Sequence, residues 1–315
     1  MGFHEDWGTR AARWAGVRSE WVDLGGTRAH VLRADSAEQG PPQILVHGLG
    51  GAATNWLEVL PDLARRGPVV APDLPGFGRT RPPRSQASRV TTNARFLKAL
   101  LDELGFERAV VHGNSMGGLL SVLLAELAPE RLAGLVLTSP AMPSPRSRVH
   151  RTDPRTVARF APFVLPGVGR LVLARMWAQM TPDQLYADTA GFVHGDPERL
   201  REELVEVAVE NVAYGRDQEW RVRGFATAAE SLVAMLVGGR RLWRAVDRLT
   251  VPTLLLWGDA DALVGPAVID GLRRRRPDWD HHTFADVGHC PQLEAPRDYV
   301  SVAGAWTAEL PVVVA

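Results

Sequence analysis

Short apolar runs alternate with amphipathic stretches of helical spacing along the 315-residue sequence, and one long stretch interrupts this rhythm. Apolar runs occur at residues 43–47, 69–71, 109–112, 132–137 and 253–257, after a predicted hairpin at 21–24 and 29–34, and a last strand is predicted at 281–284. Stretches of helical spacing occur at residues 56–65, 96–104, 116–128, 266–276 and 299–309. Because buried parallel strands are near-continuous apolar runs joined by helices, we expect an α/β fold whose mostly parallel sheet is flanked by helices.

No convincing strand is predicted between residues 143 and 244. Helical spacing occurs there instead, at residues 168–180, 197–214 and 225–237. Because the strand–helix rhythm then resumes, one α/β domain with an insertion explains the pattern better than two domains in tandem. We expect a core made of residues 1–142 and 245–315 around a helical insertion of residues 143–244. The role of residues 1–18 stays open between an extra helix on the core, a contact to the insertion and a dimer contact.

Charge and composition exclude several classes of function. Lys+Arg and Asp+Glu both total 36, so the net charge is zero, whereas nucleic-acid-binding domains carry clustered basic charge. The longest charge-free stretch, residues 109–125, is shorter than the about 20 apolar residues of a membrane span. The one cysteine cannot form a disulfide within the chain, and the N-terminus has no apolar signal core. We expect a soluble cytoplasmic protein with no nucleic-acid partner and no membrane span; its oligomeric state stays open.

A Gly-x-Ser-x-Gly pentapeptide lies where an apolar run meets a helix. It reads GNSMG, follows the run at 109–112 and opens the stretch at 116–128. A sharp strand-to-helix turn needs neighbours without bulk, which Gly113 and Gly117 provide. The helix N-terminus adds partial positive charge where an oxyanion would form. This context predicts Ser115 as a nucleophile.

A serine hydroxyl is a weak nucleophile, so a base and an orienting acid must accompany it. His289 lies in the loop after the last predicted strand and is the candidate base. Asp259 and Asp261 both follow the predicted strand at 253–257, so either carboxylate is placed to orient the base. The chain order of the three groups is serine, aspartate, histidine.

Five spaced motifs together resemble the α/β-hydrolase family. They are LVHGLGG at residues 45–51, DLPGFG at 73–78, GNSMGG at 113–118, LLLWGDADALV at 254–264 and GH at 288–289. The chain is similar to serine-nucleophile, cap-bearing members of this family, such as carboxylesterases and meta-cleavage-product C–C hydrolases. The resemblance implies an α/β-hydrolase fold in which residues 143–244 form a helical cap, or lid.

The resemblance also implies roles within the site. In the family pattern Trp-Gly-x-x-Asp the triad acid falls on Asp261, and Asp259 becomes a turn or solvated carboxylate. The other family position for the acid reads TSPA in this sequence and holds no carboxylate. The backbone N–H groups of Leu49 and Met116 are the implied oxyanion hole. His47 is interpreted as a residue that shapes its loop through hydrogen bonds to backbone.

An acyl-enzyme mechanism follows from this resemblance, with Ser115, Asp261 and His289 as the catalytic triad. Large apolar residues in the insertion favour a mainly hydrophobic, small-molecule carbonyl substrate. We expect hydrolysis of a carboxylic ester. The alternative is hydrolysis of a carbon–carbon bond in a vinylogous diketone, because GNSMGG and GHCPQLEAP resemble the meta-cleavage-product hydrolases; Cys290, where that group usually has tryptophan, weakens it. Acyl transfer with the same triad stays open, and the complete triad disfavours a catalytically inactive binding protein.

No cofactor and no metal are predicted. The adjacent His281 and His282 point to opposite faces of a predicted strand, so they cannot converge on one ion. The glycine-rich residues 48–51 follow an apolar run but lack the spacing of a dinucleotide-binding or phosphate-binding loop. The predicted chemistry therefore depends on side chains and backbone N–H groups alone.

Overall fold

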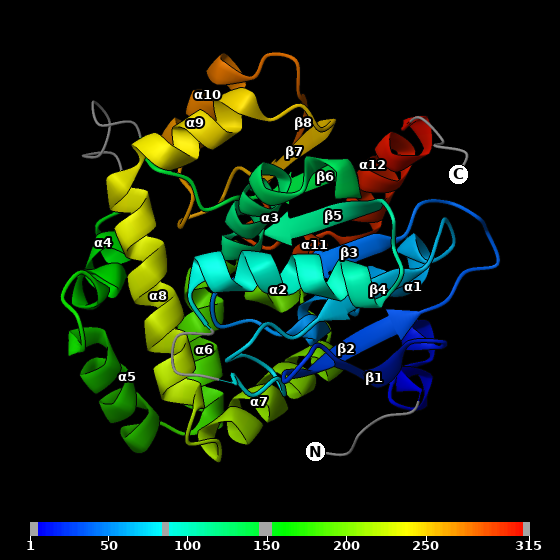
Figure 1. The fold of residues 1–315 in the computed structure, drawn as a ribbon. Helices are drawn as coiled ribbons and strands as arrows, with labels where there is room; N and C mark the ends of the chain where they lie inside the picture. Colours follow the sequence, from blue (N-terminus) through cyan, green and yellow to red (C-terminus); the bar gives the residue numbers. More distant parts are fainter. Residues whose placement is uncertain (1–5, 84–87, 145–152, 311–315) are drawn as a thin grey trace.

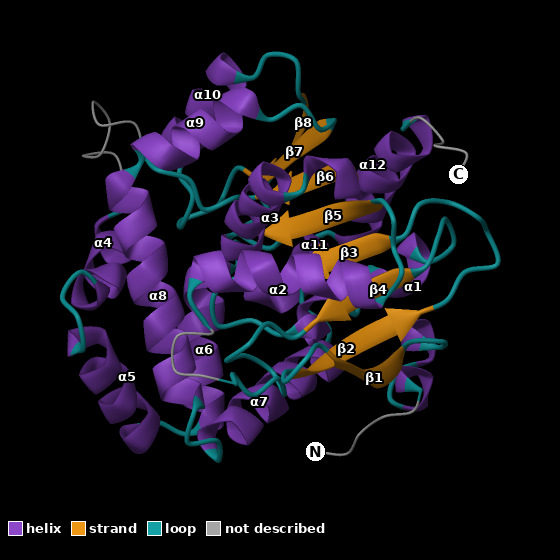
Figure 2. Cartoon of the chain, viewed as in Figure 1, coloured by secondary structure: helices purple, strands orange, loops and turns teal. Residues whose placement is uncertain are grey.

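A computed structural model describes residues 6–83, 88–144 and 153–310. In these residues eight strands form one sheet in the order β1-β2-β4-β3-β5-β6-β7-β8 (Figures 1 and 2). The strands are β1 (Arg18–Asp23), β2 (Arg28–Ala34), β3 (Gln43–Val46), β4 (Val69–Pro72), β5 (Ala109–Asn114), β6 (Leu132–Thr138), β7 (Thr253–Gly258) and β8 (Asp280–Phe284). β2 pairs antiparallel with β1 and β4, and the remaining pairs are parallel. The expected mostly parallel α/β architecture is confirmed.

Helices cover both faces of the sheet (Figure 2). They are α1 (Leu60–Leu63), α2 (Val90–Glu103), α3 (Met116–Leu127), α10 (Pro266–Arg275), α11 (Pro291–Glu294) and α12 (Pro296–Glu309). Val111 and Leu255 belong to one apolar core with α2, α3 and α10. Their neighbours Val110 and Leu254 belong to a second core with α1 and α12. Successive side chains of a strand point to opposite faces, so strands buried on both faces are apolar at most positions rather than at every second one.

Between β6 and β7 the described residues form helices and no strand. These helices are α4 (Pro154–Phe160), η6 (Ala161–Phe163), α5 (Val168–Gln179), α6 (Pro182–Val193), η7 (Pro197–Arg199), α7 (Glu202–Arg216), α8 (Arg221–Gly238) and α9 (Arg240–Arg248). We call residues 153–248 the helical segment; in Figure 1 it lies beyond the arrowhead of β5. That residues 143–244 form a separate cap domain stays a prediction.

No helix in the described part of the chain has both the length and the hydropathy of a membrane span. Within residues 6–83, 88–144 and 153–310, one bent pair of helices, Pro154–Phe163 and Val168–Gln179, has the length and composition of a span when the two are taken together.

Several helices differ from the sequence predictions. In place of one helix over 56–65 the structure has η3 (Ala53–Trp56) and α1, and Pro61 lies in the first turn of α1, where its missing N–H costs no helical hydrogen bond. Helices α4, α6, α9 and α11 are absent from the predictions. At the start of α6 the Thr181 hydroxyl accepts the Gln184 N–H, and the Gln184 side chain accepts the Thr181 N–H. This capping box, followed by proline at the first helical position, was the available sequence signal.

Residues 6–17 pack against the core and the helical segment at once. They form two short 3-10 helices, η1 (Trp7–Thr9) and η2 (Ala12–Trp14). Trp7 and Trp14 are buried in the same apolar cluster as Leu204 and Val207 of α7. Residues 1–5 lie outside the described part of the chain. For the rest of residues 1–18, two of the alternatives left open, contacts to the core and to the insertion, are both present.

Candidate active site

Ser115 lies on the sharp turn between β5 and α3. Its backbone has φ 57° and ψ −116°, a left-handed conformation that is strained for a residue with a side chain. A Cβ on Gly113 would lie 2.4 Å from the Gly117 carbonyl oxygen, and a Cβ on Gly117 would lie 2.2 Å from the Val46 carbonyl oxygen. The turn therefore requires both glycines, for the reason given by the sequence analysis.

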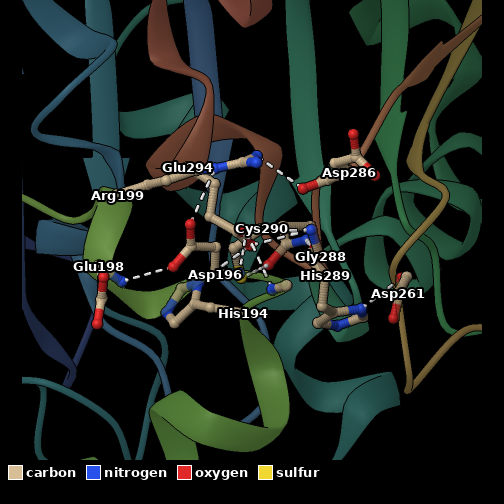
Figure 3. A network of polar contacts seen from close by, with 12 residues as sticks. His194, Asp196, Glu198, Arg199, Asp261, Asp286, Gly288, His289, Cys290 and Glu294 are labelled. Atoms are coloured by element: carbon tan, nitrogen blue, oxygen red, sulfur yellow. Dashed lines mark hydrogen bonds and ion pairs between the residues drawn. The ribbon is translucent and has the colours of Figure 1, made fainter.

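Asp261 is the aspartate that faces the candidate base. His289 Nδ1 donates to Asp261 Oδ2 over 2.8 Å, and both residues are buried (Figure 3). The other oxygen, Oδ1, accepts the N–H groups of Leu263 at 2.8 Å and Val264 at 2.9 Å. Since Oδ1 is fully engaged by backbone, Oδ2 is directed at the imidazole. The Nδ1–H tautomer leaves His289 Nε2 free to accept a proton.

Asn114 joins the turn at Ser115 to the loop of His289. Its Nδ2 donates to the His289 carbonyl oxygen at 3.0 Å and to the Thr138 carbonyl oxygen at 3.3 Å. Among the described residues, the partly exposed Ser115 hydroxyl makes no hydrogen bond of its own. Before substrate binds, such nucleophile–base contacts are often longer than a hydrogen bond. The three predicted triad residues are thus gathered at the carboxyl ends of β5, β7 and β8.

The loop after β3 approaches Ser115 from the other side. A Cβ on Gly48 would lie 3.1 Å from Ser115 Cβ, so the Leu49 N–H is next to the turn. Met116 is the first residue of α3, and its N–H has no partner within the helix. Within the described hydrogen bonds neither the Leu49 nor the Met116 N–H has an acceptor. Both donors are available beside Ser115, and the oxyanion-hole role stays a prediction.

His47 shapes this loop as the sequence analysis expects. Its Nδ1 donates to the Gly48 carbonyl oxygen at 2.7 Å, and its Nε2 accepts the Leu74 N–H at 3.1 Å. Burial lowers the pKa of His47 to about 4, against the opposing charge of Asp73. A neutral imidazole with both nitrogens engaged by backbone has no capacity left for proton transfer.

Asp73 organises the neighbouring loops, a role that sequence reasoning missed. Its carboxylate accepts the Ala53 N–H at 2.7 Å, the Arg79 N–H at 2.8 Å and His30 Nδ1 at 2.7 Å. Burial alone would raise the pKa of Asp73, but the His30 imidazole and the two N–H donors hold it at about 2. Gly78 is required here, because a Cβ would lie 2.0 Å from the Asp73 carboxyl carbon.

The apolar residues of the helical segment reach the predicted site. The cluster of buried Phe163, Ala229 and Val233 includes Leu49 at its edge. Phe225 of α8 lies against the same loop, 2.9 Å from the position of a Cβ on Gly50. Helix α8 therefore lies over the loop that carries the Leu49 N–H.

Cys290 is a buried thiol rather than a reactive one. Burial, together with the carboxylates of Glu294 and Asp261, raises the pKa of its thiol well above the usual range. Its Sγ contacts Asn114 Oδ1 at 3.5 Å. In the described residues no group of three His, Cys, Asp or Glu side chains is arranged to hold a metal ion.

Comparisons with known proteins place the chain among enzymes. A profile of the α/β hydrolase fold matches residues 41–296. The chain is 29% identical over 290 residues to 2-hydroxy-6-oxononadienedioate/2-hydroxy-6-oxononatrienedioate hydrolase of Paraburkholderia phymatum, covering 88% of this chain and 91% of that protein. A relative of the same name from Dechloromonas aromatica is 31% identical over 260 residues, covering 80% and 81%. The solved 2-hydroxy-6-oxo-6-phenylhexa-2,4-dienoate hydrolase of Rhodococcus sp. strain RHA1 is 26% identical with a TM-score of 0.73, covering 93% and 98%.

Proposed function

The chain belongs to the α/β-hydrolase fold family, and from this we propose that it is a serine hydrolase whose nucleophile is Ser115. His289 is the base that takes the hydroxyl proton, and Asp261 orients the imidazole and stabilises its charge. The observation that carries the proposal is the 2.8 Å bond from His289 Nδ1 to the buried Asp261 carboxylate, beside a serine on a strained strand-to-helix turn. A turn of this kind exposes the serine hydroxyl at the edge of the sheet.

The reaction proceeds through an acyl-enzyme. Ser115 Oγ adds to a carbonyl carbon while His289 Nε2 takes its proton, and the leaving fragment departs with that proton. Water, deprotonated by His289, then cleaves the Ser115 ester and restores the enzyme. The N–H groups of Leu49 and Met116 stabilise the tetrahedral oxyanions, each by about 3 kcal/mol. No step requires a cofactor.

Carbon–carbon bond hydrolysis is the substrate class that the relatives favour over the ester hydrolysis expected from the sequence. Relatives named as oxononadienedioate hydrolases cover most of the chain, and the solved dienoate hydrolase has the same fold. In that reaction the carbonyl attacked is a ketone, and the electron pair of the broken bond stays on a dienolate that is then protonated. Ester hydrolysis is the second candidate, because Cys290 departs from the tryptophan usual in that group.

The helical segment is proposed as the cap of the site. Phe225 over Gly50 and the apolar cluster that includes Leu49 support this, because they place α8 above the loop of the oxyanion hole. Such an apolar roof excludes water and favours a small, mainly hydrophobic substrate. A cytoplasmic location stays a prediction.

The experiment begins with a fluorophosphonate probe, which labels a serine only when a base activates it. Wild type should be labelled at Ser115, and Ser115→Ala should neither be labelled nor turn over substrate, while its circular dichroism is unchanged. A coloured ring-fission dienoate and a series of p-nitrophenyl esters are then compared at equal enzyme concentration. We expect the dienoate to have the larger kcat/KM. Faster turnover of an ester would select the second candidate, and activity in Ser115→Ala would refute the serine mechanism.

A further inference from the structure

A carboxylate without solvent exposure lies behind the loop of His289. It belongs to Glu294, the last residue of α11, and its side chain is 0% exposed. Burying a charge is costly unless hydrogen-bond donors surround it, and removing the donors leaves the charge uncompensated. The proposed triad does not use this group, so its burial needs another explanation.

Four donors from two distant parts of the chain bind this carboxylate (Figure 3). The Gly288 N–H, adjacent to His289 in the sequence, lies 3.1 Å from each oxygen. From the turn after α6, the N–H groups of Gly195 and Asp196 lie 3.0 Å and 3.3 Å from Oε2. His194 Nδ1 from the same turn lies 3.2 Å from Oε1. The carboxylate therefore joins the loop of the proposed base to the helical segment.

The backbones of these two parts also meet directly. The His289 N–H donates to the carbonyl oxygen of Val193, the last residue of α6, over 2.8 Å. A Cβ on Gly288 would lie 2.3 Å from the Gly195 nitrogen, so the chains touch without room for a side chain. The His289 N–H is thus held by the helical segment itself. The Gly288 N–H is held by the Glu294 carboxylate, which the helical segment also binds.

We propose that Glu294 is a positioning residue that fixes the catalytic base to the cap, so that His289 is correctly placed only while the turn after α6 is seated on it. This rests on the proposed function, in which His289 is the base. If the His289 loop and the turn after α6 moved apart, the buried Glu294 carboxylate would lose hydrogen-bond donors. The cap, in addition to roofing the site, holds the backbone of the base.

The energetic consequence concerns the reaction more than substrate binding. Asp261 sets the tautomer and the tilt of the imidazole, but the backbone of His289 sets where the ring is in relation to Ser115. A displacement of about 1 Å in a catalytic group lowers a rate about 100-fold. Loosening the Glu294 contacts should therefore lower kcat while the apolar pocket, and with it KM, changes little.

The test compares Glu294→Gln with Glu198→Gln. Glutamine keeps the shape of Glu294 but replaces one acceptor oxygen by an NH2 group that faces N–H donors. Glu198, on η7, undergoes the same chemical change at an exposed position. We expect E294Q to lower both kcat and the rate of fluorophosphonate labelling by about 10- to 100-fold with KM within about threefold, and E198Q to match wild type. Wild-type labelling by E294Q, or a change confined to KM, would overturn the proposal.

Amide hydrogen exchange tests the contact between the His289 loop and the turn after α6, here called the joint, without relying on activity. In E294Q the amides of Gly195 and Gly288 should both lose protection, because the one oxygen left on the glutamine cannot accept from all the donors that the two carboxylate oxygens hold. His194→Phe, which keeps a ring but removes this one donor, is the second variant if E294Q does not fold; it should give a smaller loss of the labelling rate, about threefold to tenfold. Exchange that rises in one part alone would refute the joint. A wild type that no probe labels would instead refute the proposed function, and exchange would still decide the joint.

Discussion

The two aspartates after β7 have opposite environments although one residue separates them. Asp261 is buried and bonds to His289, whereas Asp259 is exposed and its Oδ1 accepts the Asp286 N–H at 2.7 Å. Asp286 has φ 56°, so Asp259 supports a strained turn in the loop that leads to His289. One carboxylate therefore faces the imidazole and the other supports the backbone.

Replacing each aspartate by asparagine separates these two roles. Asp261→Asn should lower kcat about 10⁴-fold, because an amide NH2 facing Nδ1 favours the wrong imidazole tautomer. Asp259→Asn keeps an oxygen for the Asp286 N–H and should change kcat less than about threefold. Steady-state rates on the best substrate, or fluorophosphonate labelling, measure both. A larger loss in D259N than in D261N would reverse the assignment of the acid.

Single residues were predictable where one local segment places them. Ser115 is fixed by the glycines around it, Asp261 follows the end of a strand that an apolar run reveals, and His289 follows the strand predicted at 281–284. Glu294 was not predictable as a positioning residue, because its donors His194, Gly195 and Asp196 lie about a hundred residues away in the chain. The sequence gives no signal for a partnership that only folding brings together.

A buried network of hydrogen-bonded polar side chains connects β5 to β3 and α12. His112 of β5 contacts Gln43 Oε1 through Nε2 at 3.1 Å and the Tyr299 hydroxyl through Nδ1 at 3.0 Å. Because Gln43 Nε2 already donates to the Leu63 carbonyl oxygen, Gln43 Oε1 acts as the acceptor for His112 Nε2–H. The Tyr299 hydroxyl then donates to Nδ1. When His112 is neutral, the hydrogen bonds of His112, Gln43 and Tyr299 in this network are all compatible with one another.

This arrangement makes the fold sensitive to acid. Burial lowers the pKa of His112 to about 3, whereas an unfolded histidine titrates near 6.5. Between these pH values the unfolded chain binds a proton that the folded chain does not, so the stabilisation present above pH 6.5 is lost as the pH falls.

His112→Gln removes this titration. The variant should be less stable than wild type at pH 8 by about 1–3 kcal/mol, because a buried hydrogen bond is lost. The difference in unfolding free energy between the two proteins should be about 2 kcal/mol smaller at pH 5, since only wild type loses the stabilisation that comes from a neutral His112. Urea unfolding at the two pH values measures it, and His47 contributes equally to both proteins. A difference independent of pH would show that His112 is not held neutral.

Strands and helices were predictable where burial requires a regular pattern of apolar residues. The apolar runs locate β3 to β7 to within a residue or two, because each of these inner strands packs on both faces. β8 is an edge strand of mostly polar residues, in which only Phe284 is buried. Helix α6 escaped prediction because it buries only Leu185 and Ala190, so its apolar spacing is weak. A helix that is largely exposed leaves its caps as the main signal.

At the scale of the whole molecule, the N-terminal residues brace the core against the helical segment. Trp7 and Trp14 are buried, and their rings meet edge to face at 6.1 Å. Arg10 pairs with Glu206 and Glu210 of α7 at 3.0 Å and 2.7 Å. An apolar contact and a charged contact thus join the start of the chain to the same helix.

The two kinds of contact should differ sharply in energy. Trp14 is 0% exposed, so Trp14→Ala leaves a cavity and should cost about 3–5 kcal/mol of unfolding free energy. Arg10→Gln breaks pairs whose carboxylates are largely exposed and screened, and should cost less than about 1 kcal/mol. Urea unfolding at low and high salt measures both, and added salt should shrink the Arg10 effect alone. Equal costs would mean that the charged contact contributes as much as apolar burial to holding the described N-terminal residues, the core and α7 together.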